Sequence, residues 1–180
     1  MNARRVLLLA LPLLAATAGA WAQPPRAARE SAVKAAYLYK FGTFVEWPAG
    51  SFRAADDPVV IAVAGDEAVA SELDRLARGG NIEGRPVQVL RWRDGEDGKH
   101  LHILYAGGPR ESRIRAVLAA ARGPVLTVAD GPVSGKPGPV LYFTQEDGRV
   151  RFNASLPAAA ARNLKLSAKL LAVALQVEGR

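Results

Sequence analysis

The two histidines of the chain lie two residues apart, at His100 and His102. In a strand this spacing points both imidazole rings to the same face, so they could offer two ligands to one metal ion. A catalytic zinc site needs a third protein ligand, and nothing in the sequence supplies one at a characteristic spacing. We therefore predict no metal site, and we interpret the pair as partly buried or solvated strand histidines.

Asp66, Gly107 and Asp130 each follow an apolar run that is typical of a strand. Ligands of layered α/β proteins bind at the carboxyl ends of the strands, so these three residues mark a candidate small-molecule site. The sequence has neither the glycine spacing of a dinucleotide fingerprint nor a phosphate-binding loop. Asp66 is also explained as a helix N-cap and Asp130 as a turn residue, and we favour these structural roles.

Nucleophilic chemistry has little support in the sequence. None of the serines stands in a G-x-S-x-G turn. The chain has no cysteine, which excludes thiolate metal sites, cysteine nucleophiles and a disulfide framework. The sequence therefore predicts a binding protein without a cofactor rather than an enzyme. An uncatalogued hydrolase that uses Asp66, His100 or Asp130 is the competing possibility.

The elements that would position these residues alternate along the chain. Apolar runs at 59–63, 87–92, 100–105 and 125–128 predict strands, and amphipathic segments with helical spacing lie after the first and third of them. This order predicts an α/β fold, a mostly parallel layered sheet flanked by helices, of the Rossmann-like kind.

A hairpin is expected to close the sheet. The apolar run 140–143 is followed by Asp147–Gly148 and by the alternating segment 149–153, a pattern that predicts two antiparallel strands joined by a tight primed turn. Val150 and Phe152 then share one face of the second strand. Two strands alone are not stable in water, so the hairpin must form the edge of a larger core.

The hairpin is followed by two predicted helices. Pro157 suits the first turn of a short helix, Asn163 suits the left-handed residue that ends it, and Ser167 can cap the next helix. We expect this last helix to extend to Val177, because its apolar residues recur with helical spacing. The antiparallel C-terminal hairpin and helix together complete the predicted fold.

A helix is also predicted near the start of the mature chain. From Ser31, apolar residues recur at intervals of three and four, and Trp47–Pro48 is expected to end the helix because the residue before a proline is disfavoured in helices.

Four aromatic residues lie along this helix or shortly after it: Tyr37, Phe41, Trp47 and Phe52. The favoured interpretation is that they pack against the sheet. The alternative is that they anchor a protein partner, because aromatic side chains near an apolar helix end often do so.

The N-terminus resembles a cleavable secretory signal. Arg4 and Arg5 precede the uncharged apolar run 6–20, and a small-x-small pattern ends at Ala22, where we expect cleavage. The run is shorter than the roughly 20 residues that span a bilayer, so we predict no retained membrane insertion. The domain plan is a signal at 1–22, a flexible leader at 23–30 and a single domain at 31–180.

Loss of the signal removes two arginines and lowers the net charge from +7 to +5. The remaining charges are scattered as mixtures of both signs, whereas a nucleic-acid-binding surface would concentrate basic and aromatic residues. We therefore predict no nucleic-acid partner.

Four segments resemble the YfiR-like family of exported bacterial proteins: 35–41 (AAYLYKF), 44–48 (FVEWP), 149–153 (RVRFN) and 164–171 (LKLSAKLL). The resemblance covers about Ser31 to Val177, nearly the whole mature chain. It implies a periplasmic α/β domain, commonly a homodimer, without known catalysis.

The resemblance also implies a partner. Well-understood relatives inhibit a membrane-bound diguanylate cyclase by binding its periplasmic sensor region, which lowers cyclic di-GMP and restrains biofilm formation. Gly138-Pro139-Val140 stands where the family usually has two glycines before an apolar residue, and Asn163 stands where it often has glycine. Redox control through disulfides, known for such regulators, cannot operate in a chain without cysteine.

Three functions follow in order of preference. The first is a periplasmic repressor of an inner-membrane sensor, with Tyr37, Phe41, Trp47 and Phe52 as candidate contacts. The second is a periplasmic small-molecule-binding protein with its pocket near Asp66, Gly107 and Asp130. The third is the hydrolase named above.

Overall fold

The computed structural model describes residues 25–135 and 138–179. The expected signal at 1–22 and the first two residues of the expected leader lie outside this part of the chain. Within it, five helices and ten strands follow one another in the order α1, β1, β2, α2, β3, β4, β5, α3, β6, β7, β8, α4, β9, α5, β10.

The helices are α1 (Arg26–Phe41), α2 (Glu67–Ala77), α3 (Glu111–Ala120), α4 (Leu156–Ala160) and α5 (Ala168–Val173). The longer strands are β2 (Val59–Ala64), β4 (Arg85–Arg91), β5 (Ile103–Ala106), β6 (Leu126–Ala129), β7 (Leu141–Glu146) and β8 (Arg149–Ser155). Four two-residue strands complete the set: β1 (Val45–Glu46), β3 (Asn81–Ile82), β9 (Lys165–Leu166) and β10 (Val177–Glu178).

Eight strands form one sheet in the order β10-β8-β7-β6-β5-β2-β4-β3. The neighbouring strands β4, β2, β5, β6 and β7 run parallel to one another. Ile61 of β2 is paired to Val89 of β4 and to Ile103 of β5. β7 and β8 form the antiparallel hairpin. The predicted α/β class, with a mostly parallel sheet flanked by helices, is confirmed.

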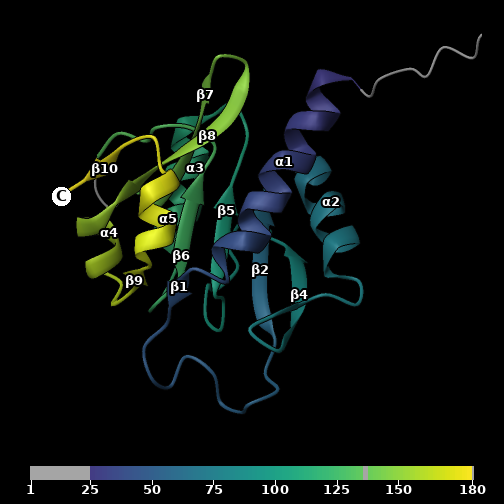
Figure 1. Cartoon of the computed structure of the whole chain (residues 1–180), viewed down its shortest axis with the longest axis vertical. Coiled ribbons are helices and arrows are strands. Elements are labelled where there is room, and N and C mark those ends of the chain that lie inside the picture. Colours follow the sequence, from purple (N-terminus) through teal and green to yellow (C-terminus); the bar gives the residue numbers. More distant parts are fainter. Residues whose placement is uncertain (1–24, 136–137, 180) are drawn as a thin grey trace, which may run out of the picture.

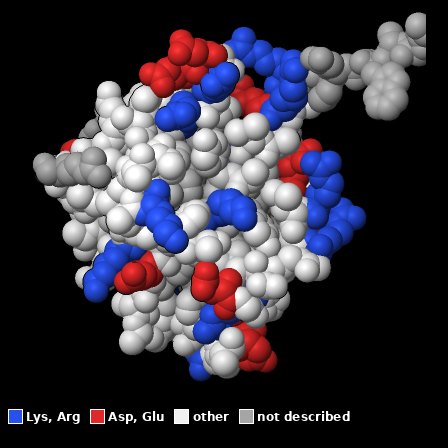
Figure 2. Space-filling model, viewed as in Figure 1, with Lys and Arg blue, Asp and Glu red and all other residues white. Residues whose placement is uncertain are grey.

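The sheet separates two apolar cores. The larger core lies under α1, α2 and α5, and the smaller one lies under α3. Figure 1 shows α1 and α5 on the near side of the sheet and α3 behind it. On the near face, basic and acidic side chains are interspersed between broad uncharged areas (Figure 2).

The hairpin turn has the predicted geometry. Asp147 and Gly148 both have positive φ, 49° and 71°, as a two-residue primed turn requires. Pro157 lies in the first turn of α4, Asn163 has φ 54° after it, and the Ser167 hydroxyl accepts a hydrogen bond from the backbone N–H of Leu170. These local predictions are therefore confirmed.

The boundaries of the first helix were predicted wrongly. α1 begins at Arg26, inside the segment expected to be a flexible leader, and ends at Phe41. Gly42 then packs against Ile82, where a Cβ atom would lie 2.7 Å from the isoleucine Cδ1. The residues after it form β1, because Val45 pairs with Leu166 from the other end of the chain.

The end of the last helix was also predicted wrongly. α5 stops at Val173, and Ala174 is extended. The chain then forms β10, which runs parallel to β8 with Val177 opposite Ala154. The free backbone groups of β8 explain the change, since they bind the final residues as an edge strand.

Candidate functional site

The carboxyl ends of β2, β5 and β6 lie side by side, as the sequence predicts. Asp66, Gly107 and Asp130 follow these strands, and the backbone N–H groups of Gly107 and Asp130 donate to the carbonyl groups of Ala64 and Ala106. The structure therefore brings the three predicted ligand-binding positions to one edge of the sheet.

Tyr105 links two of them. Its side chain is fully buried, and its hydroxyl donates to Asp66 Oδ2 at 3.4 Å. Burial raises the pKa of the Tyr105 hydroxyl, and the charges of Asp130 and Asp66 raise it further. The phenol thus stays protonated and serves as a hydrogen-bond donor between two carboxylates.

Lys34 of α1 completes this cluster, and the sequence analysis missed it. The side chain is 8% exposed, and its Nζ lies 2.6 Å from Glu30 Oε1 and 2.7 Å from Asp130 Oδ1. Burial alone would lower the pKa of Lys34, but hydrogen bonds and the charges of Asp130 and Glu30 outweigh it and raise the pKa. The i, i+4 spacing of Glu30 and Lys34 on an apolar helix was the signal that could have revealed the pair.

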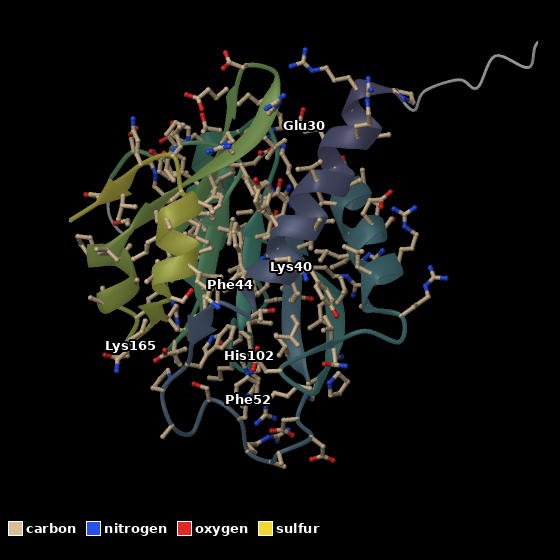
Figure 3. The ribbon with its side chains drawn as sticks, in the orientation of Figure 1. Glu30, Lys40, Phe44, Phe52, His102 and Lys165 are labelled. Atoms are coloured by element: carbon tan, nitrogen blue, oxygen red, sulfur yellow. The ribbon has the colours of Figure 1, made fainter. Side chains whose placement is uncertain are left out.

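The cluster also reaches the tip of the hairpin. Gln145 of β7 donates to Glu30 at 2.7 Å and accepts from Arg26 at 2.9 Å. Figure 3 shows Glu30 at the hairpin end of the molecule, far from Phe52 and His102. The hydrogen bond from Lys34 lowers the pKa of Glu30, so both groups are charged and paired at neutral pH.

Neither of the two cavities found among the described residues is lined by Asp66, Gly107 and Asp130 together. The Gly65 and Gly107 backbones touch, because a Cβ atom on Gly65 would lie 2.4 Å from the Gly107 carbonyl oxygen. Asp66 Oδ1 accepts from the Val69 N–H at 3.0 Å and caps α2. The cavity beside Asp130, of about 280 Å³, is lined by Glu30 and Lys34 but not by Asp66 or Gly107.

A larger cavity, of about 950 Å³, lies between the loop after β6 and helix α4. Pro124, Val133, Tyr142 and Arg162 are among its lining residues. Burial lowers the pKa of Arg162, whose guanidinium donates to the Leu118 carbonyl at 3.4 Å. This volume is in the range of ligand sites, and the sequence analysis did not identify it.

The four aromatic candidates divide into two groups. Phe41 belongs to the larger core and the partly buried Tyr37 packs against it, with Phe41 stacked on Tyr37 at 5.7 Å and edge-on to Phe152 at 4.9 Å. Phe41 is 1% exposed. The core interpretation therefore describes Phe41, whose side chain is not available to a partner.

Trp47 and Phe52 lie on the segment 47–58, which we call the aromatic loop. This loop joins β1 to β2 and projects from the end of the sheet opposite to the Lys34 cluster (Figure 1). Both side chains are half-buried, and their rings meet edge-on at 6.1 Å. The aromatic loop thus keeps part of two large apolar side chains at the surface.

His102 packs against the two aromatic side chains of the aromatic loop. The Phe52 ring stacks on its imidazole at 4.2 Å and 10°, and Trp47 meets it edge-on at 5.8 Å. Figure 3 shows His102 and Phe52 together at this end of the molecule. Arg85 lies on the other side of Phe52, with its guanidinium 3.9 Å from the ring centroid.

The prediction that both histidines share a strand face was wrong. β5 begins at Ile103, and His100 is exposed with φ 66° in the turn before it. His102 is 6% exposed and directed into the protein. In the described part of the chain, no three histidine, cysteine or acidic residues are grouped as metal ligands would be.

Among the described helices, none is long and apolar enough to cross a membrane.

Comparison with known proteins gives one family. The family model DUF4154, described as YfiR/HmsC-like, matches residues 31–175. None of the curated proteins compared with the chain matches it.

Proposed function

The chain belongs to the YfiR/HmsC-like family of periplasmic regulators, and on this premise we propose that it represses a membrane-bound diguanylate cyclase. It would bind the periplasmic sensor region of the cyclase, lower cyclic di-GMP and restrain biofilm formation. The family match over residues 31–175 is the observation that carries this proposal.

The proposed action is a shift of a conformational equilibrium. A repressor lowers the active population only by its difference in affinity for the two states of the sensor. A difference of about 3 kcal/mol lowers the ratio of active to inactive sensor about a hundredfold. Such a mechanism needs a contact surface but no reactive group in the repressor.

The aromatic loop is the proposed contact surface. Trp47 and Phe52 are half-buried, and they are held on a loop rather than inside a helix or strand. Aromatic side chains of this kind contribute most of the binding free energy in many protein interfaces. Tyr37 and Phe41 support the fold beneath, because they pack against Phe143 and Phe152 of the hairpin.

The polar groups at the opposite end of the sheet are consistent with binding rather than catalysis. Lys34, Glu30, Asp130 and Tyr105 are hydrogen-bonded or ion-paired with one another or with Asp66. A general acid or base must be free to exchange its proton with a substrate. These groups instead join α1 to the sheet.

A deletion strain tests the proposal. Loss of the gene should raise cyclic di-GMP, and the wild-type gene should restore the lower level. A double variant, Trp47→Ala with Phe52→Ala, should fail to restore it and should not retain a membrane cyclase in a pull-down. Leu76→Ala is the control, because Leu76 is 39% exposed and lies on α2.

The folded state of each variant is checked by its melting temperature. If the double variant does not fold, Phe52→Leu replaces it in the same measurements. An unchanged cyclic di-GMP level after deletion, with no cyclase recovered by the wild-type protein, would reject the cyclase as the partner.

Small-molecule binding is the second candidate function. The cavity of about 950 Å³ beside Arg162 favours it, and the site would then lie there rather than at Asp66, Gly107 and Asp130. A thermal-shift screen of metabolites should find compounds that raise the melting temperature of the wild-type protein but not of Tyr142→Ala. A screen without any such compound would count against this function.

A further inference from the structure

His102 is fixed in one neutral tautomer by two backbone groups. The Val60 N–H donates to Nδ1 at 3.1 Å, so Nδ1 carries a lone pair. Nε2 lies 3.2 Å from the Ser51 carbonyl, which can only accept, so Nε2 carries the hydrogen. Since Ser51 belongs to the aromatic loop and Val60 to β2, the neutral imidazole joins the loop to the sheet.

Two charged groups face this position, Arg85 of β4 and Asp57 of the aromatic loop. Arg85 of β4 donates to the carbonyl groups of Ala54 and Asp57 at 2.8 and 3.1 Å and lies over Phe52. Burial lowers the pKa of His102; the Ser51 carbonyl opposes this effect, the charge of Arg85 adds to it, and the charge of Asp57 again opposes it. His102 is therefore neutral when the aromatic loop is docked, that is, packed against the sheet.

We propose that protonation of His102 releases the aromatic loop from the sheet. A second proton on Nδ1 would direct an N–H group at the N–H of Val60, and neither donor could bond to the other. The charge would also lie in a nearly water-free position under Phe52. Movement of the loop exposes the ring to water and leaves the imidazole free to turn away from the Val60 N–H, which removes both conflicts.

The direction of the pH effect follows from the same geometry. In the released loop His102 regains its ordinary pKa of about 6.5, whereas in the docked loop its pKa is lower. The contribution of neutral His102 to the docked state is therefore fully present above about pH 6.5. Below this pH, the ratio of docked to released loop falls by up to tenfold per pH unit until the pKa of the docked state is reached.

The consequence for regulation rests on the proposed function. If Trp47 and Phe52 contact the sensor, release of the loop in acid weakens that contact and relieves repression. Acid would then act as the releasing signal in a chain that has no cysteine for redox control.

The experiment uses residues 23–180 and follows pH from 8 to 4.5. The His100→Gln variant leaves His102 as the only histidine, so its imidazole resonances are assigned without ambiguity. In this variant the imidazole signal and the amide signals of residues 47–58 should titrate with one midpoint below pH 6.5. Loop amides that stay unchanged while His102 titrates would overturn the proposal.

The matched variant is His102→Gln, which places an amide near the position of Nε2 but cannot titrate. Fluorescence of Trp47, recorded with Trp92→Phe, should change with pH in the wild type and in His100→Gln, but not in His102→Gln. An equal change in all three proteins would also overturn the proposal. If His102→Gln does not fold, the resonance titration of His100→Gln decides alone.

Partner binding is measured separately, at pH 7.5 and 5.5. Retention of the membrane cyclase at pH 7.5 and its loss at pH 5.5 in the wild type, but not in His102→Gln, would support the regulatory consequence. Retention that is equal at both pH values, although the loop moves, would reject it. If the loop moves and no cyclase is retained at either pH, the proposed function fails while the histidine switch stands.

Discussion

Lys34 shows how a single side chain can join distant parts of this protein. Its ammonium group is nearly excluded from water and touches one carboxylate from its own helix and one from the end of β6. A buried charge is tolerated only when it is paired, and removal of one partner leaves the others poorly solvated. The effect of a substitution should therefore depend on burial more than on charge.

Lys34→Met is expected to lower the free energy of unfolding by about 3 kcal/mol, because it leaves Glu30 and Asp130 without their shared cation. Urea denaturation followed by circular dichroism measures the loss. Lys40→Met is the control, since Lys40 lies on the same helix and is exposed. We expect a change within about 0.5 kcal/mol for the control, and equal losses would contradict the role of burial.

The same pair predicts how stability depends on acid. The pKa of Glu30 is lower in the folded protein than its ordinary value of 4.5, chiefly through its hydrogen bond with Lys34. Its contribution is therefore complete above about pH 4.5 and is lost as the pH falls further. Wild-type stability should decline more steeply below pH 4.5 than that of Lys34→Met, as measured by urea midpoints at each pH.

The pKa of Lys34 is raised, so its stabilising contribution has the opposite pH dependence and is lost only in strong alkali, above the ordinary pKa of 10.5. Parallel acid profiles of the two proteins would show that Glu30 and Lys34 are not coupled.

At the scale of elements, the aromatic loop depends on two side chains outside it. His102 binds the Ser51 carbonyl, and Arg85 binds two further carbonyl groups of the loop. The loop contains no helix or strand of its own. Within the loop, the backbone N–H groups of Arg53 and Ala54 donate to the Asp57 carboxylate. The position of the loop on the sheet therefore depends on the contacts of His102 and Arg85 and on the packing of Trp47 and Phe52.

Arg85→Gln should loosen the aromatic loop while leaving the rest of the fold intact. We expect hydrogen exchange of the amides at 53–57 to become at least about tenfold faster, the equivalent of about 1.4 kcal/mol. Arg91→Gln, at the other end of β4, is the control and should not change exchange there, because Arg91 pairs with Glu67 and Asp74 of α2. Unchanged exchange in Arg85→Gln would show that the hydrogen bonds of Arg85 do not hold the loop.

The sequence predicted the elements that depend on local patterns. The apolar runs of β2, β5 and β6 and the turn at Asp147–Gly148 lie where expected, because strand burial and positive φ leave a direct signature in residue type. β1 and β10 were missed because each exists only through a distant partner strand. Short apolar segments of this kind fit helical spacing equally well.

The candidate site shows the same division. The edge with Asp66, Gly107 and Asp130 was predicted from the rule for strand ends, but the close contact of Gly65 with Gly107 was not, since it depends on packing. Lys34 and Tyr105 were missed because a charged or phenolic residue in an apolar pattern does not reveal its partners. The link from His102 to the aromatic loop was hidden for the same reason.

At the scale of the whole molecule, one sheet is shared by two cores. Trp47 packs against the larger core and Trp92 belongs to the smaller one. Both cores use alternate residues of the same strands, for example Ile61 and Ala62 of β2. The loss of either core would therefore expose one face of strands on which the other core also depends.

Unfolding should accordingly be a single transition. Trp92→Phe leaves Trp47 as the reporter of the larger core, and Trp47→Phe leaves Trp92 as the reporter of the smaller core, in a chain that starts at residue 23. For each variant, the urea midpoint from fluorescence should coincide with the midpoint from far-ultraviolet circular dichroism. Separate midpoints would indicate that the two sides unfold independently and that residues 31–180 are not one cooperative domain.

The contacts of α1 with the hairpin set the order in which the protein can be assembled. Arg26 and Glu30 both bind Gln145, more than a hundred positions later in the chain. A nascent polypeptide that lacks the hairpin cannot complete the surroundings of its own first helix, and distant contacts of this kind slow folding. Such a delay suits a member of a periplasmic family, because a chain that is still unfolded at the end of translation can be threaded through a narrow membrane channel.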